Sequence, residues 1–255
     1  MHPIAIQFGK FSIHWYGILV AVGFVVGFWT ASRRAPQSGI APDTIMDFAP
    51  WLLLGAVVGA RLLHVISYWN EEFAGKPFTD VFMIQRGGLV FYGGFAGASI
   101  AYVLFARSRH LPLWKVADIF APSISLGHFF GRLGCLMTGC CFGRPTSLPW
   151  AIQFPPGHDT FPDHVHPVQV YEALLNLALY GGLALLYRRK KFDGQVFAAY
   201  LICYAVLRSF VETFRADYRS GEFLFYSFLK PGQTVSIAVL AAGLVLFWTL
   251  SRKRA

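Results

Sequence analysis

Long apolar segments alternate with short polar connections along this chain. Seven of these segments come close to the ~20 residues that an α-helix needs to cross a bilayer. They cover residues 14–32, 44–69, 88–106, 116–137, 166–187, 195–214 and 231–251. The pattern therefore predicts an all-α integral membrane protein with seven transmembrane helices, organised as a single polytopic membrane domain over residues 1–255.

The composition favours the same setting. Of the 255 residues, 55% are hydrophobic and 14% are charged, and the mean hydropathy is +0.49. A soluble domain of this composition would expose too much apolar surface to water. Residues 1–10 lack the basic start and the small-residue cleavage site of a signal peptide, so we expect the first apolar segment to be retained.

Lysine and arginine are distributed unevenly over the connections, and this distribution predicts the orientation. Twelve lie on one set of connections and in the C-terminal tail: Arg33, Arg34, Arg107, Arg109, Lys115, Arg188, Arg189, Lys190, Lys191, Arg252, Lys253 and Arg254. Seven lie on the other set: Lys10, Lys76, Arg86, Arg144, Arg215, Arg219 and Lys230.

The more basic set is expected in the cytoplasm. The C-terminus is then cytoplasmic and the N-terminus periplasmic or extracellular, with outer-face loops at about residues 70–87, 137–165 and 215–230. The net charge of +9 is mainly a result of this topology and faces anionic membrane lipids. Nothing in it indicates a nucleic-acid partner.

Arg132 is the anomaly of the fourth apolar segment, because a guanidinium group keeps its charge even there. An arginine inside a spanning helix costs roughly 2.5 to 3.5 kcal/mol on insertion scales, so it is expected to face a polar cavity and a partner. Two interpretations stay open. Arg132 forms a structural ion pair with a neighbouring helix, or it captures an anion inside the membrane.

Two further stripes of polar residues lie on apolar helices. Arg61, His64 and Tyr68 are spaced i, i+3 and i+7, which places them on one helix face. A second stripe, in the sixth segment, has a net positive charge in spite of its carboxylate and consists of Tyr204, Arg208, Glu212 and Arg215. Such stripes should point into the bundle or a water-filled cavity, and we expect an anionic ligand to meet the second one.

Glycines and cysteines mark the remaining unusual segments. The glycine-rich residues 87–98 allow another backbone or a ligand to approach closely. Cys135, Cys140 and Cys141 lack the Cys-x-x-Cys spacing of structural zinc sites, so we predict no metal site, and a disulfide from Cys135 to either of the others stays open. We expect these cysteines to be structural, and Cys203 to serve as a small apolar residue.

Motifs along nearly the whole chain resemble the bacterial phosphatidylglycerol prolipoprotein diacylglyceryl transferases. The matching segments are His14-Trp15-Tyr16-Gly17, Gly59-Ala60-Arg61-Leu62, Gly87-Gly88 with Tyr92-Gly93-Gly94, Gly131-Arg132-Leu133-Gly134 with Gly139 and Gly143-Arg144, His166-Pro167 with Tyr171-Glu172, and Tyr204 with Arg208, Glu212 and Arg215. Members of this family have seven spans and an outer N-terminus, in agreement with the topology predicted from charge.

The resemblance implies a reaction at the outer leaflet of the bacterial cytoplasmic (inner) membrane, without a cofactor. The diacylglyceryl group of phosphatidylglycerol passes to the thiol of a lipobox cysteine in a signal-peptide-bearing prolipoprotein, and glycerol 1-phosphate is released. Arg132 matches the family arginine that holds the lipid phosphate, and Arg208 matches one that the family needs for transfer. Fixed guanidinium groups suit this reaction because negative charge grows on the departing phosphate.

We therefore predict two overlapping sets of site residues. The catalytic set is Arg132, Arg208, Tyr92 and Glu212. The substrate-binding set is Arg132, Tyr16, Arg61, Gly93, Gly94, Gly134, Gly139, His166 and Tyr204.

The sequence departs from the family pattern at three positions. Tyr92 stands where many members carry histidine, and Cys135 and Cys140 stand where many carry asparagine and glutamate. A tyrosine with a pKa near 10 is a poor base at neutral pH, so the residues leave the general base unidentified.

The alternatives to this function are a paralogue with another acceptor, a lipid-binding member without catalysis, and a transporter of anionic lipids or anions. A transporter would be expected to carry paired broken helices in related halves, and the sequence shows no such repeat.

The charge distribution yields a topology test. Residues 188–191 and 252–254 should be cytoplasmic and residues 137–165 outside. Cysteine-accessibility labelling in intact cells should leave a cysteine at Ser251 unlabelled by a membrane-impermeant reagent. Labelling of that position from outside contradicts the orientation.

Overall fold

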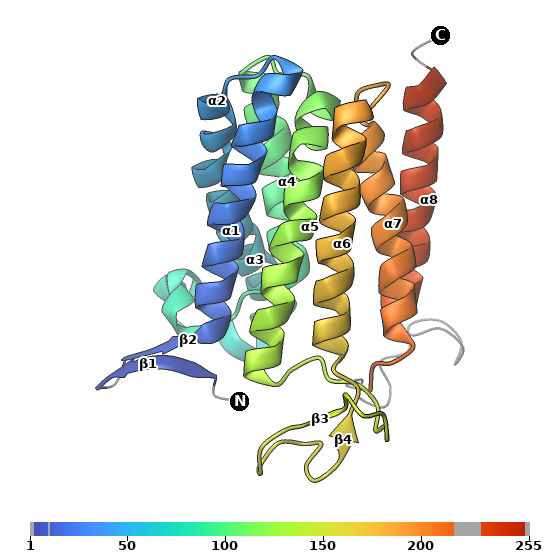
Figure 1. The fold of residues 1–255 in the computed structure, drawn as a ribbon. Helices are drawn as coiled ribbons and strands as arrows, with labels where there is room; N and C mark the ends of the chain where they lie inside the picture. Colours follow the sequence, from blue (N-terminus) through green and yellow to red (C-terminus); the bar gives the residue numbers. More distant parts are fainter. Residues whose placement is uncertain (1–2, 10, 217–230, 253–255) are drawn as a thin grey trace. The chain divides into compact units, whose positions relative to one another are not determined.

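All seven predicted segments form helices in the computed structural model (Figure 1), which describes residues 3–9, 11–216 and 231–252. The helices are α1 (Trp15–Arg34), α3 (Phe48–Ser67), α4 (Phe91–Ser108), α5 (Leu113–Thr138), α6 (Val168–Arg189), α7 (Gln195–Glu212) and α8 (Pro231–Arg252). The prediction of an all-α membrane protein is confirmed. Most of the outer loop predicted at residues 215–230 lies outside the described residues.

Five helical segments of the described chain are long and apolar enough to cross a membrane. They are Trp15–Ser38, Pro42–Ser67, Val168–Arg189, Gln195–Glu212 and Gly232–Arg252. The other two predicted spans, α4 and α5, are helices of 18 and 26 residues with more glycine or polar residues. The chain is therefore a multi-pass membrane protein, while the number of seven crossings and the orientation stay predictions.

The short elements lie between and before these helices. An antiparallel hairpin of β1 (Ile4–Phe8) and β2 (Phe11–His14) precedes α1, and β3 (Ile152–Gln153) pairs with β4 (His164–Val165) in the connection after α5. The other short elements are η1 (Ala35–Ser38), α2 (Pro42–Met46), η2 (Trp69–Phe73), η3 (Phe78–Phe82) and η4 (Ile84–Arg86). A pattern of long apolar segments does not predict elements this short.

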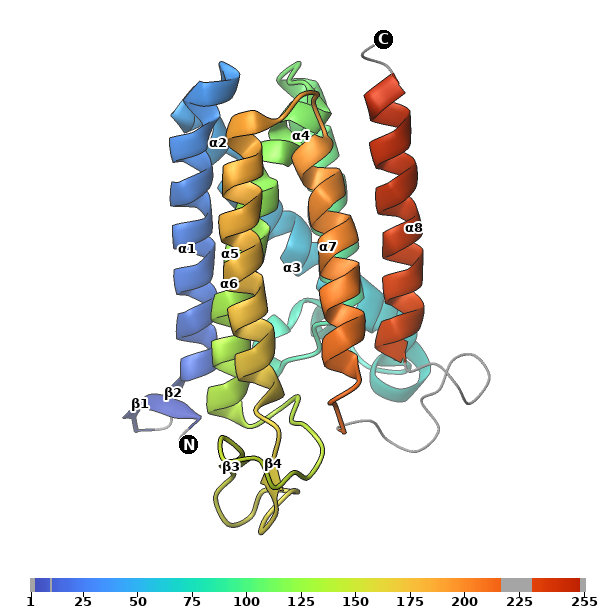
Figure 2. The ribbon, with the colours of Figure 1, turned by 45° about the vertical axis from the view of Figure 1, so that its right-hand side comes forward.

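The chain forms two compact units, one of residues 32–116 and one of residues 1–31 with 117–255. In the second of these, α6, α7 and α8 lie side by side in sequence order (Figures 1 and 2). Gly23 lets α1 approach α5, because a Cβ at Gly23 would come within 3.0 Å of the Phe130 Cβ. The hydroxyl groups of Thr30 and Ser123 then hydrogen-bond at 2.9 Å.

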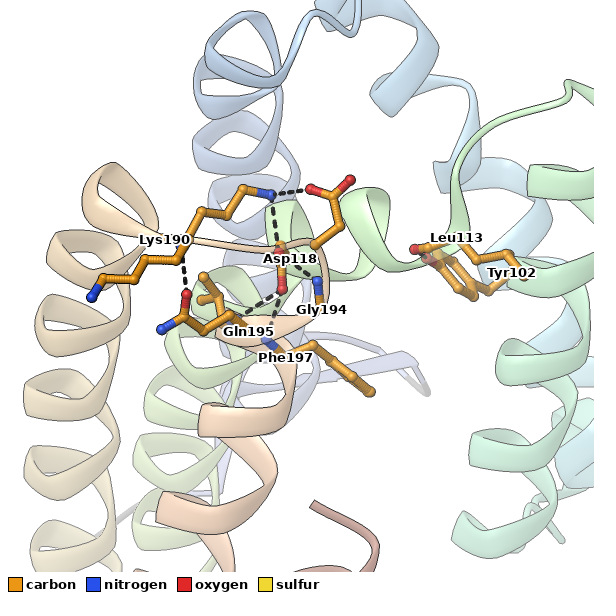
Figure 3. A network of polar contacts seen from close by, with 10 residues as sticks. Tyr102, Leu113, Asp118, Lys190, Gly194, Gln195 and Phe197 are labelled. Atoms are coloured by element: carbon orange, nitrogen blue, oxygen red, sulfur yellow. Dashed lines mark hydrogen bonds and ion pairs between the residues drawn. The ribbon is translucent and has the colours of Figure 1, made fainter. Parts of the chain in front are cut away.

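Asp118 of α5 has a fully buried carboxylate that caps the N-terminus of α7. It accepts hydrogen bonds of 2.9 Å from the backbone N–H groups of Gly194, Val196 and Phe197, and one of 3.0 Å from Lys190 Nζ (Figure 3). These are donors that the first turn of a helix leaves without intrahelical partners. Burial opposes the charge on Lys190, but the Asp118 carboxylate outweighs this effect and raises the pKa of the amine.

Glycines also set the packing in the unit of residues 32–116, where α3 and α4 are in contact. A Cβ at Gly93 would overlap the backbone oxygen of Gly59, and a Cβ at Gly97 would overlap that of Gly55. Small residues at a helix crossing are typical of membrane proteins, where close van der Waals packing replaces the hydrophobic effect. In the same unit the Tyr102 hydroxyl donates to the Leu113 carbonyl at 2.6 Å (Figure 3).

Replacing Asp118 by Asn should destabilise the protein, because the α7 N-terminus loses its anionic partner and Lys190 keeps only the more exposed Asp193 carboxylate at 3.0 Å. Loss of one member of a buried pair typically costs ~3 to 5 kcal/mol. The matched control is Asp47→Asn, which removes an exposed pair with Arg109 at 3.8 Å and should cost at most about 1 kcal/mol. Unfolding of both variants in detergent measures the difference. Equal losses would contradict a structural role for Asp118.

Candidate active site

Arg132 lies on the side of α5 that faces α6. Its Nη2 atom is 2.8 Å from Oε1 of Glu172, whose side chain is only 5% exposed. The anomalous arginine of the fourth segment therefore has a carboxylate partner inside the helix bundle. The structural ion pair, one of the two interpretations that the sequence left open, is therefore present. Further charged residues surround it.

Arg208 of α7 approaches the same carboxylate from the other side. Its Nη1 atom lies 3.6 Å from Glu172 Oε2, and its Nη2 atom lies 3.0 Å from Glu212 Oε2. Glu212 is fully buried, is 3.9 Å from Nη1 of Arg215 and accepts the Gly232 N–H of α8 at 3.1 Å. We call Arg132, Glu172, Arg208, Glu212 and Arg215 the arginine–glutamate cluster. It connects four helices of one unit.

The contact between Arg208 and Glu172 is incomplete. At 3.6 Å the two groups attract each other, but they are too far apart for a hydrogen bond. Within the described residues, Nη1 of Arg208 and Oε2 of Glu172 are buried without any hydrogen-bond partner. Buried polar atoms are nearly always hydrogen-bonded, so these two need an explanation. An anionic oxygen beside Arg208 would satisfy its unused donor.

Tyr204 and Tyr16 lie close to the cluster. Tyr204 is one turn before Arg208 and interacts electrostatically with Glu172, Arg208 and Arg132. Tyr16, at the start of α1, interacts with Arg132 and is about half exposed. Gly134 permits this approach, because a Cβ there would come within 2.9 Å of the Tyr16 ring.

A tight turn follows the end of α5 and brings three thiols together. Gly139 and Cys141 have positive φ angles of 84° and 62°, and the sulfur atoms of Cys135, Cys140 and Cys141 lie within 4.8 Å of one another. Hydrogen bonds with the other two thiols lower the pKa of Cys141, and the positive charges of Arg215 and Arg132 lower it further. The sequence left open a disulfide from Cys135 to one of the other two, but it did not predict that all three thiols would meet.

The rest of this loop is fixed to the end of α7. The Arg144 backbone N–H donates to the Phe214 carbonyl at 2.8 Å, and Gly143 forms a β-bridge with Arg215. The His166 N–H donates in turn to the Arg144 carbonyl at 3.0 Å. His166 therefore lies beside the end of α7, where its ring is 5.2 Å from the Phe214 ring. The structure thus brings Tyr16, Arg132, Gly134, Gly139, His166, Tyr204, Arg208 and Glu212 into one unit.

Arg61 belongs to the other unit and is engaged with backbone carbonyls. Its Nε atom donates to Val81 at 2.7 Å, Nη2 donates to Asp80 at 2.8 Å, and Nη1 donates to Gly87 at 2.9 Å and to Gly88 at 3.2 Å. The guanidinium group thereby fixes the connection that leads into α4. The described contacts of Arg61 are those of a positioning residue.

Tyr92, Gly93 and Gly94 lie in the first turns of α4. Tyr92 is 64% exposed and lines an open apolar groove of about 690 Å³ between α3 and α4. Gly93 lies where the two helices touch, so its lack of a side chain is explained by packing. Gly94 is less crowded, because a Cβ there would be 3.3 Å from the Ala56 carbonyl oxygen.

Sequence reasoning did not assign Glu172 to the site, although it lies at the centre of the cluster. Gln169, Glu172 and Asn176 are all buried and are spaced i, i+3 and i+7 on α6. This is the spacing that identified Arg61 and its neighbours on α3, so the same test would have found Glu172. The stripe lies near the start of α6, where polar residues are common and give little signal.

Known proteins match this chain along nearly its whole length. The family model for prolipoprotein diacylglyceryl transferase matches residues 3–249. The phosphatidylglycerol–prolipoprotein diacylglyceryl transferase of Finegoldia magna is 36% identical over 247 residues, which are 96% of this chain and 94% of that protein. Those of Nitratidesulfovibrio vulgaris and Synechococcus elongatus are each 35% identical, over 99% of this chain and 94% and 89% of their own. The chain therefore belongs to the prolipoprotein diacylglyceryl transferase family.

Proposed function

We propose that this protein transfers the diacylglyceryl group of phosphatidylglycerol to the lipobox cysteine thiol of a prolipoprotein, releasing glycerol 1-phosphate. The reaction is the first step of bacterial lipoprotein maturation and takes place at the outer face of the cytoplasmic membrane. The observation that carries the proposal is the buried arginine–glutamate cluster in a chain that matches this family over residues 3–249.

The charges of the cluster suit a phosphodiester. Its three arginines and two glutamates carry one more positive than negative charge, and a phosphodiester carries one negative charge. Arg132 and Arg208 are mostly buried, with 20% and 15% of their side chains exposed. In such a setting a guanidinium group interacts more strongly with phosphate than it does in water, and its planar fork fits two phosphate oxygens.

The chemical step moves negative charge toward these arginines. The thiolate sulfur forms a bond with the terminal glyceryl carbon of the diacylglyceryl group. The bond from that carbon to the phosphate oxygen breaks, and its electron pair leaves with glycerol 1-phosphate. Arg208, whose Nη1 donor is not hydrogen-bonded in the described structure, is suited to interact with the charge as it develops.

The other predicted residues have supporting roles in this proposal. Glu212 orients Arg208, and Tyr204 and Tyr16 border the phosphate beside Arg132. Gly134, Gly139 and His166 shape the backbone beside the cluster, whereas Arg61, Gly93 and Gly94, which the sequence also assigns to substrate binding, lie in the other unit. Tyr92 lines the apolar groove of that other unit, and its part in the reaction stays a prediction.

The direct test uses purified protein, phosphatidylglycerol and a lipobox peptide, followed by mass spectrometry of the peptide. The peptide should gain the mass of one diacylglyceryl group on its cysteine, and a peptide with serine at that position should gain nothing. An unmodified cysteine peptide in the presence of folded protein contradicts the proposal. Transport of the lipid without modification of the peptide would favour the transporter alternative.

The two arginines should differ in their effects on binding and turnover. Arg132→Ala should weaken both lipid binding and turnover, because Arg132 holds the phosphate throughout the reaction. Arg208→Ala should keep most of the binding and lose ~2.7 to 4 kcal/mol of transition-state stabilisation, roughly a hundredfold to a thousandfold in rate. Phosphatidylglycerol affinity and single-turnover rate measure the two effects separately.

Two further variants make this comparison specific. Arg132→Lys should not recover full activity, because a lysine point charge lacks the planar fork. Arg109→Ala is the matched control, since Arg109 is exposed and pairs only loosely with Asp47 at 3.8 Å. An Arg208→Ala protein with the parental rate would remove Arg208 from the catalytic residues.

A further inference from the structure

The three clustered cysteines are the chemically strongest feature that the proposed reaction does not use. Their sulfur atoms lie within 4.8 Å of one another, at the end of α5 and in the turn that follows it. The thiols of Cys135 and Cys141 are partly exposed and that of Cys140 is exposed, so a solvated ion has access to them. The fourth cysteine of the chain, Cys203, is on α7 and does not belong to this group.

The backbone that carries the thiols is held in place from several directions. The Gly139 carbonyl accepts a hydrogen bond from His158 Nε2 at 2.8 Å, and the Cys140 carbonyl accepts one from the buried Gln169 at 2.7 Å. Cys141 adopts a left-handed conformation that is uncommon for residues other than glycine. Backbone strain of this kind persists only where the surrounding contacts enforce it. The contacts around the turn therefore hold the three sulfur atoms close together.

We propose that Cys135, Cys140 and Cys141 bind one thiophilic divalent cation, zinc being the natural choice, with three thiolates and one open coordination position. Zinc–sulfur bonds of ~2.3 Å in a tetrahedron place sulfur atoms about 3.8 Å apart, so these thiols need to approach one another by about 1 Å at most. Three protein ligands with an open position are the pattern of catalytic zinc sites, whereas structural sites are closed by a fourth ligand.

The surroundings favour this ion over the other uses of three thiols. A zinc ion with three thiolates carries one net negative charge, and Cys141 lies within the electrostatic influence of Arg215 and Arg132. A disulfide would join only two of the sulfur atoms and leave the third without a role. Within the described residues, no histidine or carboxylate joins the three thiols, which leaves the fourth position for a ligand from outside the chain.

The open position has a natural occupant if the proposed function is correct, since that function supplies a thiol as acceptor. A thiol that coordinated zinc there would release its proton to the surrounding water and bind as a thiolate. The acceptor sulfur would then meet the glyceryl carbon as a thiolate, while Arg132, which interacts electrostatically with Cys135 and Cys141, holds the phosphate. This arrangement supplies the deprotonation for which the residues otherwise provide no evident base. The three cysteines would then bind a metal ion in this chain, whereas their spacing in the sequence suggested a structural role without a metal.

The first experiment tests the metal site alone and needs neither substrate nor turnover. The full-length protein in detergent is reduced, treated with a chelator and titrated with cobalt(II), which reports tetrahedral thiolate ligation by its visible and near-ultraviolet bands. One cobalt per chain should bind and be displaced by zinc. Cys135→Ser/Cys140→Ser/Cys141→Ser should lose the bands, and the matched control Cys203→Ser should keep them. A reduced wild-type protein without these bands overturns the proposal, even if it is an active transferase.

The second experiment tests the open position. A lipobox peptide with cysteine should shift and strengthen the cobalt–thiolate bands, whereas the same peptide with serine should leave them unchanged. Cobalt bands that are unaffected by the cysteine peptide would overturn the assignment of the acceptor to this site. Non-reducing alkylation of protein as isolated from the membrane should find all three thiols protected together and released by a chelator. Two thiols that react only after reduction would show a disulfide instead and contradict the metal site.

Discussion

The Glu172 carboxylate holds two arginines inside a bundle of apolar helices, and the rest of the site depends on this contact. An isolated charge in this environment is costly, so each member of the cluster requires its partners. Because Arg132, Glu172 and Arg208 come from α5, α6 and α7, the requirement for charge pairing also fixes how these three helices meet. Glu212 extends the same constraint to α8 through the Gly232 N–H. The same ion pairs therefore fix how the helices pack and place the arginines in the geometry that suits phosphate binding.

A second polar anchor acts near the other end of α5. Asp118 and Arg132 are fourteen residues apart on this helix, or about 21 Å by the rise of an α-helix. Asp118 begins α7 and binds Lys190 just after α6, while Arg132 binds Glu172 near the start of α6. Apolar side chains do little to orient helices that are surrounded by lipid, so polar contacts and small residues provide the specificity. Polar contacts at the two ends of α5 and close glycine contacts with α1 together fix its position in this unit.

The sequence was sufficient for the helices and for much of the candidate site. The length of the apolar segments was enough to predict all seven helices. Membrane helices must satisfy their backbone hydrogen bonds internally and are largely apolar. The spacing of Tyr204, Arg208 and Glu212 predicted that they share one helix face, and Arg208 and Glu212 pair on α7 at 3.0 Å. The single-domain organisation, the number of crossings and the roles of the site residues stay predictions.

Contacts between segments far apart in the sequence were beyond this reasoning. Nothing local to Cys135 indicates that a turn with two left-handed residues returns Cys140 and Cys141 to its side. The helical stripe placed Arg61 on a polar helix face but did not indicate that its donors hold the carbonyls of a connection about 20 residues further along the chain. Such contacts arise from the tertiary fold, which residue periodicity does not describe.

Double-mutant cycles test most directly whether one carboxylate, Glu172, fixes both arginines. The free energies of unfolding in detergent would be measured for Glu172→Gln, Arg132→Gln and Arg208→Gln and for the two double variants that contain Glu172→Gln. Residues in one buried ion-pair network should show a coupling free energy of about 0.5 to 3 kcal/mol in each cycle. Additive effects in either cycle would show that Glu172 does not hold that arginine and would contradict the account.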